Sequence, residues 1–228
     1  MELAVLYYPL DSGSIFCQRT LTIFYLDIRN NILCDNICTD NPNSEAEDDI
    51  VFRLAALTLQ IEYGDWNKRK FASEADYLCL FRNLMSERFY ATYAKEWKDR
   101  VLTYHKQHFR LKHEAAVVEY LNVAQTLPMY GVSYFSVKRR WSKNNKVQNL
   151  LGLHGAGINV YSLADRRNPI VCLSWSDILA FKTKRTKRLK NYFTIDTLRE
   201  KLVFVVANER TCKLMKTLCK GNKKLNIY

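Results

Sequence analysis

The chain has 228 residues, of which 48% are hydrophobic and 25% charged, the usual balance for a globular protein with a hydrophobic core. It has no run of about 18 uncharged apolar residues, and its N-terminus lacks a basic start and an apolar segment, so the sequence predicts neither a transmembrane helix nor a signal peptide. The net charge of +12 is unevenly distributed. Residues 1–128 carry 14 basic and 18 acidic side chains, whereas residues 129–228 carry 21 basic and 5 acidic ones, which predicts an anionic partner for the second part.

The first part of the chain has the apolar spacing of helices. A short strand is expected at residues 2–8, before the turn residues around Pro9. Helical faces then run from Leu21 to Ile32, from Ile50 to Ile61, over residues 74–84, from about Arg88 to His108, and from Val117 to Leu127. Gly64 and Pro128 are expected to end the second and the last of these helices. The pattern predicts a bundle of four main helices.

At Gly131 the apolar period changes from that of a helix to that of a strand. Seven short strands are expected at 132–138, 149–153, 158–163, 170–174, 178–183, 190–196 and 201–207. A final helix should begin after Asn208, a favourable N-cap, and end at Gly221. Seven strands closed by one helix predict an orthogonal sandwich of the pleckstrin or phosphotyrosine-binding type.

Several separated segments resemble the FERM domain, the membrane-docking module of ezrin, radixin, moesin and merlin. They are AVLYYPLD (4–11), LAALTLQIEYGDW (54–66), EYLNVAQTLPMYGVSYFSVK (119–138), LLGLHGAGINVY (150–161), SWSDILAF (174–181) and LCKGNKKL (218–225). The resemblance implies an α+β fold in which a helical bundle like acyl-CoA-binding protein precedes a PH/PTB-like seven-stranded sandwich with a C-terminal helix. It implies that residues 1–10 are the last strand of a truncated ubiquitin-like first lobe, 11–130 the helical second lobe and 131–228 the PH/PTB-like third lobe.

The resemblance also implies a function. It indicates a non-catalytic adaptor without cofactors that links the plasma membrane to the cortical cytoskeleton. The expected partners are acidic inner-leaflet lipids, phosphatidylinositol 4,5-bisphosphate among them, cytoplasmic tails of membrane proteins and cytoskeletal proteins. The expected location is cytoplasmic, at the inner face of the plasma membrane. The alternative is the targeting fragment of a FERM-containing tyrosine phosphatase or kinase whose catalytic domain lies outside this chain.

The segment KTKRTKRLK (182–190) is the richest cluster of charge. In the ezrin–merlin group the hairpin at this position carries lysines that bind phosphatidylinositol 4,5-bisphosphate, and the resemblance transfers that role to this chain. The alternative is a solvated hairpin whose charges only keep the protein soluble. The predicted lipid-binding residues are Lys182, Lys184, Arg185, Lys187, Arg188, Lys190, Arg199, Lys201 and Lys213. Trp141, in a second basic loop, could insert at the bilayer interface or be an exposed aromatic side chain without a role.

The groove between the fifth strand and the C-terminal helix is the second predicted site. In the FERM family, tails of adhesion proteins add to this strand by β-augmentation. Ile178 and Phe181 fit the strand wall. On the helix wall, Lys220 and Lys223 stand where family members tend to have an aliphatic or Met residue and a His, and Lys216 lies one turn earlier. We therefore expect an acidic peptide there. The alternative is a sheet edge that the helix covers and no peptide occupies.

Signals for other classes of site are weak. Gly155 and Gly157 form a lone Gly-x-Gly that opens no helix, and Cys34 and Cys38 have the wrong spacing for zinc. The seven cysteines are an odd number, which favours reduced thiols in the cytoplasm. A nucleic-acid interface is suggested by charge alone, because the aromatic residues follow the basic run instead of alternating with it. The sequence therefore predicts no catalytic, metal or nucleic-acid site.

Overall fold

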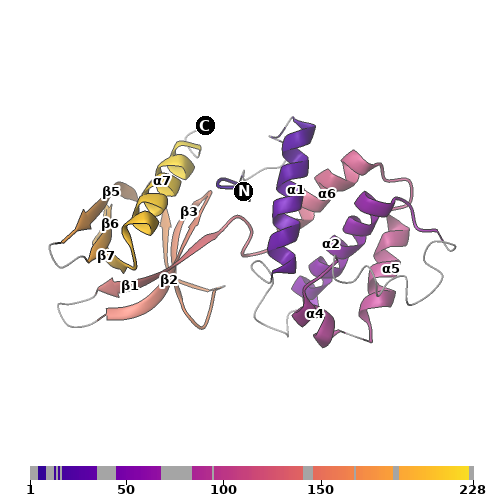
Figure 1. The fold of residues 1–228 in the computed structure, drawn as a ribbon, viewed down its shortest axis with the longest axis horizontal. Coiled ribbons are helices and arrows are strands. Elements are labelled where there is room, and N and C mark those ends of the chain that lie inside the picture. Colours follow the sequence, from indigo (N-terminus) through magenta and orange to yellow (C-terminus); the bar gives the residue numbers. More distant parts are fainter. Residues whose placement is uncertain are drawn as a thin grey trace. The chain divides into compact units, whose positions relative to one another are not determined.

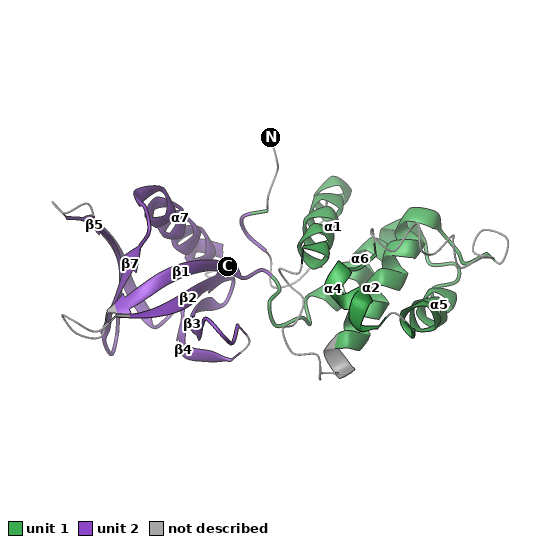
Figure 2. Ribbon diagram, turned by 60° about the horizontal axis from the view of Figure 1, so that its bottom comes forward, with its two compact units in different colours: residues 1–5, 11–130 green, residues 6–10, 131–228 purple. Residues whose placement is uncertain are grey.

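The structure is a computed structural model. It describes residues 5–8, 13, 15, 17–34, 45–67, 84–93, 95–140, 146–166, 168–186 and 190–225. The chain divides into two compact units (Figures 1 and 2). One comprises Met1–Val5 with Asp11–Tyr130, and the other comprises Leu6–Leu10 with Gly131–Tyr228.

The first unit is helical. Its described helices are α1 (Gln18–Leu33), α2 (Glu45–Tyr63), α4 (Glu87–Thr92), α5 (Trp97–Gln107) and α6 (His113–Ala124). Helix α2 packs against α5 and α6, and α1 packs against α6. The apolar face predicted for the first helix is confirmed, because Leu21, Tyr25, Ile28 and Ile32 are all buried. Helix α2 ends before Gly64, whose φ of 75° lies in the left-handed region that ends many helices, as the sequence predicted.

The single helix predicted from about Arg88 to His108 is two helices, α4 and α5, with turn residues at positions 93, 95 and 96 between them. The hydroxyl of Tyr93 bonds to Asp48, and that of Tyr104 bonds to the neighbouring Asp49 at 2.5 Å. One straight helix would separate positions 93 and 104 by about 16 Å along its axis, too far for both to reach adjacent carboxylates. These tertiary contacts therefore explain the break.

The sequence also predicted a strand at residues 2–8 and a short helix at residues 74–84. The strand expected at residues 2–8 is wrong for its described part, because Val5–Tyr8 has no regular secondary structure. The Val5 amide donates to Asp27 Oδ1 at 3.3 Å, and the Tyr7 hydroxyl donates to the Thr217 carbonyl at 3.2 Å. The short helix expected at 74–84 lies outside the described residues apart from its last position.

The second unit is a seven-stranded antiparallel sheet with one helix. Its elements are β1 (Ser133–Arg140), β2 (Lys146–His154), β3 (Gly157–Ser162), β4 (Pro169–Ser174), β5 (Ile178–Arg185), β6 (Asn191–Thr197), β7 (Lys201–Val206) and α7 (Glu209–Leu225). The strand order is β4-β3-β2-β1-β7-β6-β5, so β4 and β5 are the two edges. Strands β2, β5, β6 and β7 contact α7 (Figure 1). All seven predicted strands are present, with bounds that differ by a few residues.

Helix α7 supplies much of the core of this unit. Cys212, Met215, Leu218 and Cys219 are buried against the inward side chains of the sheet. Leu214, on the same helix, is 41% exposed. The predicted cap is confirmed, because the Thr211 amide donates to Asn208 Oδ1 at 2.8 Å.

The prediction that this helix ends at Gly221 is wrong, because α7 continues through Gly221 to Leu225. A Cβ atom at Gly221 would lie 2.3 Å from the ring of Tyr7. The glycine therefore admits the Tyr7 ring to the helix surface and does not act as a cap.

Candidate functional site

The basic hairpin, which we define as β5, β6 and their connecting turn, carries most of the predicted lipid-binding residues. Lys182 lies opposite Thr194 in the register, and Lys184 lies opposite Tyr192. Because side chains alternate along a strand, Lys182 and Lys184 project from the same face of the sheet. Lys187 and Arg188 lie outside the described residues.

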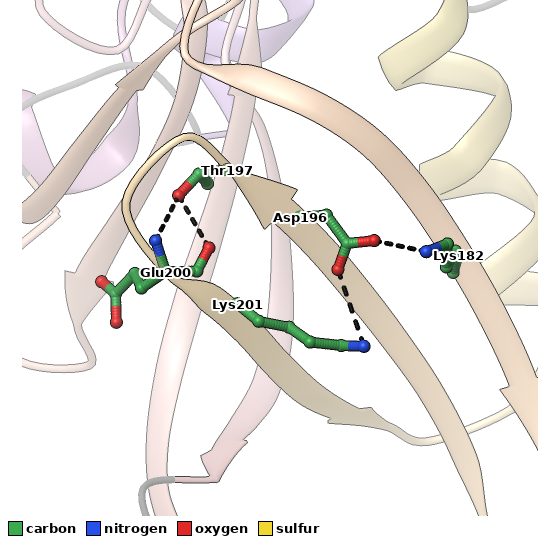
Figure 3. A network of polar contacts seen from close by, with 5 residues as sticks. All are labelled: Lys182, Asp196, Thr197, Glu200 and Lys201. Carbon is green, nitrogen blue, oxygen red and sulfur yellow. Dashed lines mark hydrogen bonds and ion pairs between the residues drawn. The ribbon is translucent and has the colours of Figure 1, made fainter.

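Asp196 binds two of the predicted cations (Figure 3). Its carboxylate accepts from Lys182 Nζ at 2.6 Å and lies 3.7 Å from Lys201 Nζ. The hydrogen bond from Lys182, with the positive charge of both lysines, holds the pKa of Asp196 below its usual value. The group of three therefore has a net charge of +1 at neutral pH, although it contains two lysines.

Glu209, at the start of α7, binds a second pair of cations. It lies 3.0 Å from Arg185 and 2.8 Å from Lys213, one turn along the helix. The bond from Lys213 and the charge of Arg185 lower the pKa of Glu209. Of the seven predicted lipid-binding residues that the structure describes, four thus have an acidic partner within the protein.

The remaining predicted cations lie apart. Lys184 and Lys190 are exposed and have no ion-pair partner in the part of the chain that the structure describes. Arg199 lies in the turn between β6 and β7, at the opposite end of β6 from Lys190. Seven residues of strand separate these two positions by about 20 Å. The nine predicted residues therefore do not form one compact cluster.

The predicted peptide groove lies beside β5, which is an edge of the sheet and packs against α7. Ile178 is 1% exposed, and the Phe181 ring lies 6.2 Å from that of Trp175 and 6.3 Å from that of Phe193. A register shift follows Ile178 and leaves Leu179 61% exposed. The strand wall of the groove thus has an apolar floor, and β5 pairs with no second strand among the described residues.

The three lysines predicted on the helix wall differ in environment. Lys216 is half-buried and Lys220 is exposed. Lys223 is half-buried, and its Nζ donates to the Ile178 carbonyl oxygen at 2.6 Å. Lys223 therefore already binds a backbone acceptor at the beginning of the edge strand.

The acidic partners of these cations were absent from the sequence-based prediction. Glu209 and Lys213 are four residues apart on one helix, so that pair could have been read from the sequence. The pairing of Asp196 with Lys182 depends on the register between two strands, which no sequence spacing indicates.

Other kinds of chemistry have little support within the described residues. No group of three or more His, Cys, Asp or Glu side chains there is placed to hold a metal ion. Burial raises the pKa of the Cys212 and Cys219 thiols, which opposes a nucleophilic thiolate on α7. Among the described helices, none combines the length and the apolar character needed to cross a bilayer.

Comparison with protein families identifies both units. Residues 11–135 match the FERM central domain, and residues 143–228 match the FERM C-terminal PH-like domain. The chain belongs to the FERM domain family. The resemblance found in the sequence is therefore confirmed.

Relatives of this FERM chain include two mosquito proteins. The Moesin/ezrin/radixin homolog 1 of Culex quinquefasciatus and that of Aedes aegypti are each 30% identical to it over 224 residues. These alignments cover 96% of this chain but only 36% of each relative. The chain thus spans little more than a third of the length of these relatives.

Solved structures confirm the fold class. The FERM domain of Drosophila Merlin, solved in complex with its C-terminal domain, has a TM-score of 0.77 at 22% identity, covering 98% of this chain and 70% of that one. The MyTH4-FERM MF2 domain of Dictyostelium discoideum myosin VII has a TM-score of 0.68 at 14% identity, covering 89% and 36%. A helical part followed by a PH-like sandwich with a C-terminal helix is the FERM arrangement, as predicted.

Proposed function

We propose that this FERM chain is a non-catalytic adaptor that docks on the cytoplasmic face of the plasma membrane and links it to the cortical cytoskeleton. The observation that carries the proposal is the combination of FERM membership over both units with a net charge of +16 in residues 129–228. In this proposal, residues 11–130 and 131–228 are the second and third FERM lobes.

The lipid-binding part of the proposal rests on charge. Each basic residue near an anionic leaflet contributes about 1 kcal/mol, and the attraction fades within a Debye length of about 8–10 Å. Lys184 and Lys190 are exposed and have no acidic partner among the described residues, so they contribute in full. The two cations bound to Asp196 and the two bound to Glu209 contribute less to the attraction, because each carboxylate with its two cations has a net charge of only +1.

The peptide-binding part rests on the open edge of β5. We propose that a cytoplasmic tail of a membrane protein adds to this edge as an extra strand. Lys216, Lys220 and Lys223 line the opposite wall, and they favour a tail with acidic side chains. The tail would replace the bond between Lys223 and the Ile178 carbonyl with a bond to its own carboxylate.

Co-sedimentation with liposomes tests the lipid-binding part. Phosphatidylcholine vesicles with and without phosphatidylinositol 4,5-bisphosphate are compared at low and high salt. The test variant replaces Lys184, Arg185, Lys187 and Arg188 with Ala. A matched control removes four exposed charges from the helical unit by replacing Arg19, Lys95, Lys106 and Lys112 with Ala.

We expect the wild-type chain and the control to bind the charged vesicles in a salt-sensitive manner, and the test variant to bind several-fold more weakly. Equal and negligible sedimentation of all three proteins would overturn the membrane-adaptor proposal. Equal loss in the test variant and the control would show that net charge, and not the basic hairpin, determines binding.

A further inference from the structure

A pocket of about 400 Å³ lies in the second unit, away from the peptide groove. Its polar lining comes from Ser136 and Lys138 on β1, Gln148 on β2, and Lys190 just before β6. Valine and alanine side chains of β7 and the turn that follows complete it. Its volume falls in the range of roughly 300–1,000 Å³ that is typical of small-molecule sites.

The strand register explains why these residues meet. Lys138 pairs with Gln148 on one side and with Val205 on the other, and Val205 pairs with Tyr192. Ser136 and Lys138 are two residues apart on β1, so both project from one face of the sheet. Lys190 precedes Tyr192 by two residues, which places it beside the same row. Residues from three separate hairpins thus converge on one surface of the sheet.

Among the described residues, the lining of the pocket contains hydrogen-bond donors and no carboxylate. Gln148 Nε2 lies 3.4 Å from Ser136 Oγ and can donate to it, which leaves the Ser136 hydroxyl hydrogen free to donate elsewhere. Lys138 and Lys190 are exposed, and neither has an ion-pair partner among the described residues. Two ammonium groups and a hydroxyl form a donor set for phosphate oxygens.

The acidic side chains near the basic hairpin do not neutralise this pocket. Asp196 is bound to Lys182 and Lys201, and Glu209 is bound to Arg185 and Lys213. These carboxylates weaken the positive field of the cations that the sequence singled out. Lys138 and Lys190, which line the pocket, are therefore exposed cations without an ion-pair partner among the described residues.

We propose that this pocket binds the phosphorylated headgroup of an inositol lipid. The inference rests on the proposed function, since it assigns the position at which the docked chain holds the lipid. The phosphates bind Lys138, Lys190 and the Ser136 hydroxyl, and the non-polar face of the inositol ring lies against Val205. Lys138 and Ser136 thereby become site residues outside the basic hairpin.

Two variants with the same change in charge test the assignment. Lys138→Gln with Lys190→Gln removes both ammonium groups of the pocket. Lys182→Gln with Lys201→Gln removes two ammonium groups of the same unit that Asp196 already binds. Ser136→Val fills part of the pocket without a change in charge, and a β-branched residue suits an exposed strand position. Circular dichroism verifies that each variant is folded.

Binding is measured by calorimetry with soluble inositol 1,4,5-trisphosphate, with inorganic phosphate, and with phosphatidylcholine vesicles that contain phosphatidylinositol 4,5-bisphosphate. We expect the Lys138/Lys190 variant to lose at least about tenfold in affinity for the trisphosphate and the vesicles. The Ser136→Val variant should lose affinity for the trisphosphate at low and at high salt. The Lys182/Lys201 variant, which loses the same two charges outside the pocket, should lose part of its affinity for the vesicles but keep its affinity for the soluble trisphosphate.

The outcomes separate this inference from the proposed function. If the wild type binds vesicles but the two double variants lose affinity equally, the pocket is not the headgroup site, although membrane docking stands. If inorganic phosphate binds as tightly as the trisphosphate, or if only a phosphotyrosine peptide binds, the inositol assignment is overturned. If the wild type binds neither trisphosphate nor vesicles, both proposals fail.

Discussion

Gly157 begins β3 at a position where no larger residue fits. A Cβ atom there would lie 2.0 Å from the backbone oxygen of Leu173, on the neighbouring strand β4. A backbone atom cannot move aside as a side chain can, so Gly157→Ala must separate β3 from β4. We expect the variant to lose about 2–3 kcal/mol in the free energy of unfolding, measured by urea denaturation.

The loss of stability in Gly157→Ala can be compared with that in Gly64→Ala. A Cβ atom at Gly64 meets nothing within 4 Å, but φ is 75°. Gly64→Ala is therefore destabilised only by the strain of a positive φ at alanine, and its free energy of unfolding should fall by about 1 kcal/mol. Equal losses in the two variants would contradict the proposed contact between Gly157 and Leu173.

At the scale of one element, the start of α7 depends on its cap. The Thr211 amide is one of the helix donors without a partner in the helix, and Asn208 Oδ1 accepts from it. Asn208→Ala should therefore cost about 1 kcal/mol of stability, measured by urea denaturation. Asn208→Ser, which keeps an oxygen at this position, should lose much less. A Ser variant as unstable as the Ala variant would contradict the capping role.

At the scale of the whole molecule, histidines couple stability to pH. Burial lowers the pKa of His105 and His108 in the helical unit and of His154 in the sheet unit. The folded chain therefore takes up these protons less readily than the unfolded chain, whose histidines titrate near pH 6.5. Stability should be constant above about pH 7 and should fall as the pH decreases toward 5.

His105 should account for a measurable share of that loss. It is fully buried, and its Nε2 lies 2.9 Å from the Gly64 carbonyl oxygen. His105→Gln keeps a donor for this carbonyl but does not titrate. We expect the difference in unfolding free energy between pH 7.5 and pH 5.5 to be up to about 1 kcal/mol smaller in the variant. An unchanged pH dependence would exclude His105 as a contributor.

The sequence predicted what local periodicity and capping determine. The buried face of α1, the cap at Asn208 and all seven strands follow from the spacing of apolar residues and from turn chemistry. The break at Tyr93 and the role of Gly221 did not follow, because each depends on a residue distant in the chain, Asp48 in one case and Tyr7 in the other.

The candidate site also has features that the sequence predicted and features that it did not. A run of lysines and arginines is visible in the sequence, and so is the pair Glu209 and Lys213. The partners of Lys182 and the meeting of Ser136, Lys138 and Lys190 depend on strand register, which the sequence does not specify by spacing. The structure therefore adds Lys138 of β1, which lines the same pocket as Lys190, to the cations that the sequence singled out.

The contact between Tyr7 and α7 has a consequence for the timing of biosynthesis. The partner of Tyr7, Thr217, lies 210 residues later in the chain. At a translation rate of about 5–20 residues per second, the tyrosine waits roughly 10–40 s before that helix is synthesised. Tyr7 can therefore contact α7 only well after the segment around it has been made.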